Sequence, residues 1–134
     1  MFARNRAVAT TQAVLSREQK TLLVEAYTTN VDPLMKLLHI PNLRRLIYSH
    51  HLDVGYGSEG TEALISAVFF AAVTSMTEEE CQRGLKDTRM GALASFRSSV
   101  EDALARANFL GHAEFTILQA LVIFLVCTLL CLCI

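Results

Sequence analysis

The stretch that decides the fold is TEALISAVFFAAVTS, residues 61–75, which is followed at once by MTEEEC. After Glu62 it carries no charged residue, and its large apolar side chains fall on every side of a helix. A helix that is apolar all round is buried, because neighbours must cover each of its faces. Small residues between the large ones allow those neighbours to approach closely: Ala63, Ser66, Ala67, Ala71 and Ala72. The pattern predicts the central helix of an all-α domain with about six helices.

Before this stretch, the sequence predicts two helices joined by a turn. Ser16 and Gln19 have the spacing of a capping box, which marks a helix N-terminus. The turn Asn30–Pro33 predicts the end of that helix and the start of another, with Asp32 as the N-cap and Pro33 at the first helical position. The first helix carries an apolar stripe at helical spacing, formed by Leu22, Leu23, Ala26 and Tyr27.

The segment between this turn and the central stretch predicts a short helix, a break, a third helix and a loop. The apolar residues of 34–38 (LMKLL) predict that the short helix is mostly buried. Pro41 predicts the break, because the residue before a proline is driven out of the helical region. Residues 42–48 then resume as a helix, and the Gly- and Ser-rich residues 49–60 form the loop. That loop contains three candidate metal or acid–base residues, for which we favour a solvated role: His50, His51 and Asp53.

After the central stretch, a short helix and a long amphipathic helix are predicted. Thr77 and Glu80 have capping-box spacing and open the short helix, which Gly84 helps to end. Asp87 or Thr88 caps the long helix, whose apolar residues recur at three- and four-residue steps. Its outer face is interpreted as solvated and carries Arg89, Arg97, Glu101, Asp102 and Arg106.

The last twenty residues, Phe115–Ile134, contain no charged side chain. Their length and composition fit a transmembrane helix. They also fit a core helix whose covering partners lie beyond residue 134, and periodicity alone does not separate the two. In the second case we expect an exposed apolar patch that promotes self-association, aggregation or membrane attachment.

The bulk properties restrict the classes of function. A chain of 134 residues is at most one domain. Its formal net charge of −1 argues against nucleic-acid binding, since domains of this size that bind nucleic acid are usually strongly basic. None of the common nucleotide-binding or catalytic motifs occurs, so we expect no enzymatic activity and no catalytic residue.

The four cysteines are not arranged as a metal site. Cys81 stands alone, and Cys127, Cys131 and Cys133 lie together in the apolar tail without the spaced pairs and turns of a zinc site. We therefore expect reduced thiols, with neither a metal nor another cofactor. Residues 1–15 contain two arginines and no acid, which favours a disordered N-terminal arm over the alternative of a mitochondrial presequence.

Three stretches share their order and spacing with one family. Two of them are residues 63–81 (ALISAVFFAAVTSMTEEEC) and residues 103–125, which include Gln119 in the run LQAL. The first in the chain is residues 16–41, whose motif positions are Asn30, Val31, Pro33, His39 and Pro41. Together they resemble the fungal-specific regulatory region (the middle homology region, of the xylanolytic-activator type) of binuclear zinc-cluster transcription factors.

The resemblance implies a partial, all-helical regulatory domain over residues 16–126, followed by an apolar extension at 127–134. The chain looks like a truncated N-terminal part of that larger domain, ending in a very apolar helix. Such domains modulate transcription through contacts with proteins or ligands, so we expect a nuclear location. The partners would be other proteins or the rest of a transcription factor. The motif positions are expected to be structural: Asn30, Pro33, His39, Pro41 and Gln119.

One departure from the family limits what the resemblance implies. Zinc-cluster factors bind DNA through six cysteines that hold two zinc ions, and this sequence contains no such cluster. Zinc and DNA binding are therefore implied for the family only, and we expect no direct DNA binding by this chain. The alternative hypothesis is a small tail-anchored membrane protein with a helical cytosolic domain, anchored through residues 115–134.

Overall fold

The computed structural model describes residues 15–36, 38, 40–49, 59–109 and 115–133, and all regular secondary structure in them is helical. When helical elements that follow one another without a break are counted as one rod, the described residues form six rods. This confirms the predicted all-α fold. Most of the predicted arm at residues 1–15, and the loop residues His50, His51 and Asp53, lie outside this part of the chain. The elements, with η marking a π-helix, are α2 (Arg17–Ala26), η1 (Tyr27–Val31), α3 (Asp32–Met35), α4 (Ile40–Ser49), α5 (Glu59–Ser75), α6 (Glu78–Glu80), η3 (Cys81–Leu85), α7 (Arg89–Phe109) and α8 (Phe115–Cys133).

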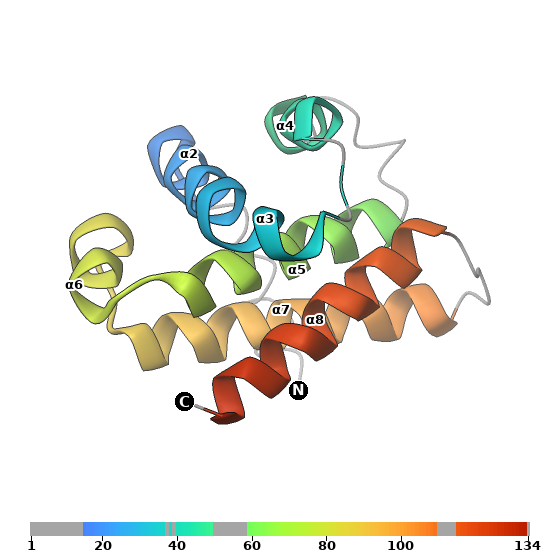
Figure 1. Ribbon diagram of the computed structural model, residues 1–134. Coiled ribbons are helices and arrows are strands. Elements are labelled where there is room, and N and C mark those ends of the chain that lie inside the picture. Colours follow the sequence, from blue (N-terminus) through green and yellow to red (C-terminus); the bar gives the residue numbers. More distant parts are fainter. Residues whose placement is uncertain (1–14, 37, 39, 50–58, 110–114, 134) are drawn as a thin grey trace.

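Helix α5 lies in the middle of the molecule (Figure 1). The rod α2–η1–α3 and helix α4 pack on one side of it, and α7 and α8 pack on the other. The short rod α6–η3 connects α5 to α7 and also contacts α2. The arrangement therefore has three layers, with α5 alone in the middle one.

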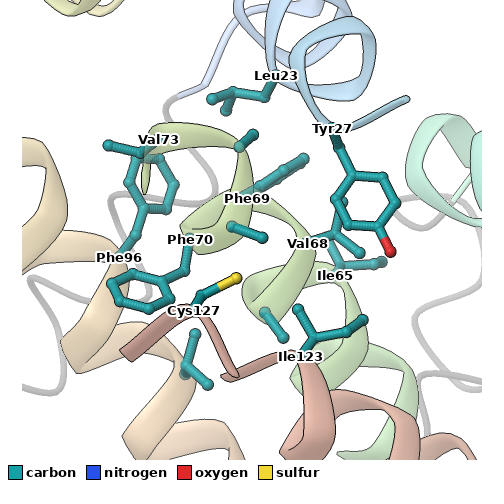
Figure 2. Close-up of a cluster of buried hydrophobic side chains, with 14 of the residues drawn as sticks. Leu23, Tyr27, Ile65, Val68, Phe69, Phe70, Val73, Phe96, Ile123 and Cys127 are labelled. Carbon is teal, nitrogen blue, oxygen red and sulfur yellow. The ribbon is translucent and has the colours of Figure 1, made fainter. Parts of the chain in front are cut away.

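The core of the protein is built around α5. Every residue from Ala63 to Val73 is at most 5% exposed. Figure 2 shows the side chains of α5 pointing to opposite sides, toward α2 and η1 in one direction and toward α7 and α8 in the other. Phe69 meets Phe96 of α7 edge-to-face, with ring centroids 6.0 Å apart, and Phe70 meets Phe124 of α8 at 5.4 Å. The prediction of a central helix that is covered on all faces is confirmed.

Both predicted capping boxes are present. The Ser16 hydroxyl accepts from the Gln19 backbone N–H at 3.1 Å, and the Gln19 side chain accepts from the Ser16 backbone N–H at 3.0 Å. Thr77 and Glu80 form the same reciprocal pair at 3.2 and 2.9 Å. Thr88 caps α7, because its hydroxyl accepts from the Gly91 N–H at 3.0 Å. Each pair satisfies backbone donors that a helix N-terminus leaves unpaired.

The first helix does not end at Asn30, as the turn predicted. It continues through η1, where a backbone hydrogen bond spans five residues in place of the four of an α-helix. The Asp32 N–H there donates to the Tyr27 carbonyl. The prediction that Asp32 is an N-cap is wrong, because Asp32 has helical backbone angles and Val31 holds that position without a side-chain bond. Pro33 is tolerated in the first turn of α3, since the wider π turn relieves the clash of a proline ring with the carbonyl four residues earlier.

The break between α3 and α4 is made by a lysine and not by Pro41. Lys36 has a left-handed backbone (φ 47°, ψ 42°) and ends α3, whereas α4 begins at Ile40 and includes Pro41 in its first turn. A proline is compatible with the first turn, where its missing N–H leaves no helical bond unmade. The predicted burial of the short helix is also wrong at Leu34, whose side chain is 80% exposed.

A second lysine ends the rod α6–η3 where the sequence pointed to Gly84. Lys86 takes the left-handed conformation there (φ 57°). Gly84 lies inside η3, and a Cβ atom on it would collide with the Leu22 side chain. Glycine is therefore needed at this position for the close approach of η3 to α2, and not for its conformational freedom.

Arg89 was predicted to lie on a solvated face, and this prediction is wrong. Its guanidinium group is half-buried and donates from Nε to the Met76 carbonyl at 3.0 Å and from Nη2 to the Thr74 carbonyl at 2.8 Å. These carbonyls lie at the C-terminal end of α5, where a positive group complements the helix dipole. Arg89 therefore ties the start of α7 to the end of α5.

Replacing Phe69 by aspartate tests the role of α5 as the core. The Phe69→Asp variant loses a fully buried ring, which alone costs roughly 3–5 kcal/mol, and it also buries an unpaired carboxylate. We expect the chain to unfold at room temperature, as measured by circular dichroism. Met90→Asp is the control, because Met90 is 80% exposed and its replacement leaves the melting temperature nearly unchanged. A Phe69→Asp chain that melts like the wild type contradicts the assignment.

Replacing Arg89 by alanine tests the contact between α5 and α7. The Arg89→Ala variant leaves two α5 carbonyls without their charged donor, so we expect a loss of about 1–3 kcal/mol in the free energy of unfolding. Chemical denaturation measures this loss. Arg97→Ala is the matched control, since Arg97 is exposed on the same helix, and we expect a change within about 0.5 kcal/mol. Equal effects of the two variants would show that the Arg89 contacts contribute nothing.

Candidate functional site

The predicted motif residues are distributed over separate elements. Asn30 lies in η1, Pro33 in α3, Pro41 in α4 and Gln119 in α8, while His39 lies outside the described residues. Pro33 and Pro41 are exposed, each in the first turn of its helix. The structure therefore does not gather the four described residues into one site.

Among the motif residues, Asn30 makes a contact between distant parts of the chain. Its Nδ2 donates to the Ser75 Oγ at 3.2 Å, which joins η1 to the last residue of α5. The Ser75 hydroxyl in turn donates to the Ala72 carbonyl at 2.8 Å. The Asn30 side chain thereby positions the π-helix against the C-terminal end of the central helix.

The described cysteine side chains are buried and unsuited to chemistry. Cys81 and Cys127 are both at most 2% exposed. Burial raises the pKa of the Cys81 thiol, Arg89 opposes this effect, and the carboxylates of Glu78, Glu80 and Asp87 add to the rise. A thiol that stays protonated is a poor nucleophile and a poor metal ligand. In the part of the chain that the structure describes, no group of three or more His, Cys, Asp or Glu residues could hold a metal ion.

Two buried polar atoms, one in η1 and one in α3, lack a hydrogen-bond partner. Tyr27 is fully buried, and neither its hydroxyl nor the Oδ1 atom of Asp32 has a hydrogen-bond partner. Burial, and then electrostatic interactions with Asp32 and Cys127, raise the pKa of the Tyr27 phenol well above its ordinary value. Figure 2 shows the Tyr27 ring packed over α5, near Ile65 and Val68. The Tyr27 hydroxyl and the Asp32 Oδ1 atom therefore each remain without a protein partner.

Sequence reasoning placed Tyr27 only in an apolar stripe. The stripe is correct, since Leu23 and Tyr27 are both fully buried. The polar role of the hydroxyl was missed because Asp32 comes near Tyr27 only through the π turn, which shifts the register of the helix by one residue. Tyr27 and Asp32 are five residues apart, which is one turn of a π-helix, but the sequence contains no pattern that predicts a π-helix there.

Helix α8 has two unlike faces. Ala120, Ile123 and Cys127 are buried against the core, whereas the opposite face is exposed and apolar. The helix runs through residue 126, where the resemblance to the regulatory region fades. Among the described residues, no helix is long and apolar enough to cross a membrane.

Replacing Tyr27 by phenylalanine tests the unpartnered hydroxyl. Removal of a buried polar atom without a partner relieves a desolvation penalty, so we expect Tyr27→Phe to be neutral or stabilising by about 1 kcal/mol in urea unfolding. A loss of stability on substitution would show that the hydroxyl has a bound partner in solution.

The same variant tests the raised pKa. Because the pKa of the phenol is higher in the folded state, its ionisation above the unfolded pKa, about 10, favours the unfolded chain. The stability of the wild type is therefore unaffected by this group below that pH and falls as the pH rises past it. Comparison of the variant with the wild type isolates Tyr27 from other groups that titrate in alkali. We expect the advantage of Tyr27→Phe to grow above pH 10.

Comparison with known proteins identifies relatives of one kind. The chain is 36% identical over 107 residues to "Transcription factor vrtR2" of Penicillium aethiopicum, covering 78% of this chain and 13% of that protein. It is 38% identical over 106 residues to "C6 finger domain transcription factor adaR" of Aspergillus niger, covering 78% of this chain and 14% of that protein. It is 31% identical over 121 residues to "C6 finger domain transcription factor nscR" of Arthroderma gypseum, covering 89% and 17%.

These relatives are much longer than the chain, which spans only 13% to 17% of their length. No family model matches the chain, and no solved structure matches it. The similarity nevertheless extends over most of the described helices, because it covers 78% to 89% of the chain. The chain therefore belongs to the fungal C6 finger transcription factors, in which its counterpart is one segment of a longer protein.

Proposed function

We propose that the chain acts in transcription regulation as a partial regulatory domain, without contacting DNA itself. The observation that carries the proposal is its similarity to named transcription factors along most of its length. Those relatives are named for transcription and not for catalysis, which favours a non-enzymatic role. The activities of the whole relatives would then depend on further parts of their longer chains.

The cysteines of this chain do not fit the zinc cluster that the family name implies. There are four cysteines in the sequence, whereas the family's cluster uses six. Cys81 and Cys127 are packed in the helical core, where they behave as small apolar residues. With a formal net charge of −1, the chain also lacks the positive charge that attracts proteins to the DNA backbone. These features support our proposal that zinc and DNA binding belong to other parts of the family's proteins.

The architecture suits a role in protein contacts. Helices pack on both sides of α5, and the outer faces of those helices carry exposed residues. A regulatory domain needs surfaces that are held in defined positions in order to bind other parts of a transcription factor or its regulatory partners. A nuclear location follows from the same proposal.

A chimeric factor tests this proposal. The segment of the Aspergillus niger relative that matches this chain is replaced by the chain itself, and transcription of the genes that the relative controls is measured. We expect the chimera to support regulated transcription, and the same chimera carrying Phe69→Asp to fail while it still binds DNA through its own zinc cluster. Met90→Asp serves as the matched control for an added surface carboxylate.

Two outcomes would contradict the proposal. A relative from which the matching segment is simply deleted, and which regulates its genes normally, would show that the segment has no regulatory role. A purified chain that shifts DNA in a sequence-selective and salt-sensitive way would show that it binds DNA directly.

A further inference from the structure

Helix α4 joins the rest of the molecule through a narrow apolar face. Leu43 and Ile47 are each 2% exposed, and their spacing of four residues places them on one side of the helix. Arg44 and Arg45, which lie between them in the chain, are exposed. Helix α4 packs on α2 and α5, but less extensively than α7 and α8 pack on α5. In Figure 1 it lies at the upper edge of the molecule.

Tyr48 adds a polar attachment between α4 and α2. Its hydroxyl lies 2.7 Å from the Thr21 Oγ1 atom, and the guanidinium carbon of Arg17 lies 4.9 Å from the centre of its ring. Arg17 and Thr21 are four residues apart in α2, so they lie on one side of that helix. One side chain of α4 is therefore held by two side chains of α2.

A neighbouring bond fixes the direction of the hydrogen bond between Tyr48 and Thr21. The Thr21 hydroxyl donates to the Arg17 carbonyl at 2.9 Å. Because a hydroxyl carries a single hydrogen, Thr21 has none left to donate to Tyr48. The Tyr48 hydroxyl is therefore the donor, and Thr21 accepts from Tyr48 while it donates to Arg17. We call these three residues the α4 latch.

The latch lies away from the contacts that join α5 to α7 and α8. Those contacts include the ring pairs Phe69–Phe96 and Phe70–Phe124, to which α4 contributes no side chain. Elements that bury few apolar side chains open at a lower free energy than the core of the same protein. Helix α4 can therefore separate while the rest of the fold keeps its main contacts.

We propose that α4 opens as a unit from a molecule that otherwise stays folded, and that the α4 latch sets how often it opens. Opening separates Leu43 and Ile47 from the core and exposes the parts of α2 and α5 that α4 covers. The closed state is the one in which Tyr48 donates to Thr21. This inference does not rest on the proposed function in transcription.

Native-state hydrogen exchange of the full chain tests the inference, under conditions where the exchange rate follows the opening equilibrium. In the wild type, we expect the amides of residues 44–48 to exchange faster than those of residues 67–73 in α5. The Tyr48→Phe variant keeps the ring beneath Arg17 but loses the donated hydrogen bond. Exchange at residues 44–48 should then rise about fivefold, as for a neutral hydrogen bond, and exchange in α5 should not change.

Two further variants separate the hydrogen bond from other effects. Thr21→Val removes the acceptor, so it should produce a similar rise at residues 44–48, and the double variant with Tyr48→Phe should add little to either single one. Arg44→Gln is the matched control on α4, because Arg44 is exposed and glutamine has a similar helix propensity. We expect it to leave the exchange rates unchanged.

Three results would overturn the inference. Wild-type amides of α4 that are as well protected as those of α5 would show that α4 opens only when the whole chain unfolds. A Tyr48→Phe variant that exchanges faster by the same factor in α4 and α5 would show that Tyr48 supports the entire fold. Effects of Tyr48→Phe and Thr21→Val that simply add would show that their hydrogen bond does not control the opening.

Discussion

Because α5 has no polar face, it is stable only where other helices surround it, and this requirement fixes the positions of the rest. The side chains from Ala63 to Val73 are all buried, although they point in every direction around the helix. Ala63, Ala67 and Ala71 recur every fourth residue and form a low row on its surface, where a neighbouring helix can approach closely. The polar contacts then secure the C-terminal end of α5, with Asn30 at Ser75 and Arg89 at Thr74 and Met76.

The features that could be predicted from the sequence are those with local causes. The composition of residues 61–75 is enough to predict a buried helix. The capping boxes at Ser16 and Thr77 each depend on two residues that are three positions apart. The apolar spacing of α7 predicted its buried residues, including Phe96 and Val100. In each of these cases, the residues that decide the structure are neighbours in the chain.

The features that could not be predicted depend on contacts between distant segments. In the sequence, Arg89 has the pattern of an exposed charged residue on a helix. It is half-buried in the structure because two carbonyl groups at the end of α5 accept its hydrogen bonds. The sequence predicted Gly84 as a helix terminator, but a glycine fits this position because the Leu22 side chain of α2 lies where a Cβ atom would be. The surroundings of the unpartnered Tyr27 hydroxyl depend on the π turn, which the sequence does not predict. Asn30 bonds to Ser75, which is 45 positions away in the chain. Motif resemblance indicated that Asn30 matters, but it did not indicate what Asn30 contacts.

The bond between Arg89 and the end of α5 also has a consequence for the order in which the chain acquires its structure. The acceptors Thr74 and Met76 are only 15 and 13 positions from Arg89, so closing this contact restricts a short loop. By contrast, Phe70 and Phe124 are 54 positions apart, and their contact requires a much larger loop to close. The pairing of α5 with α7 therefore has a smaller entropic barrier than the docking of α8, for which this pair provides the surface.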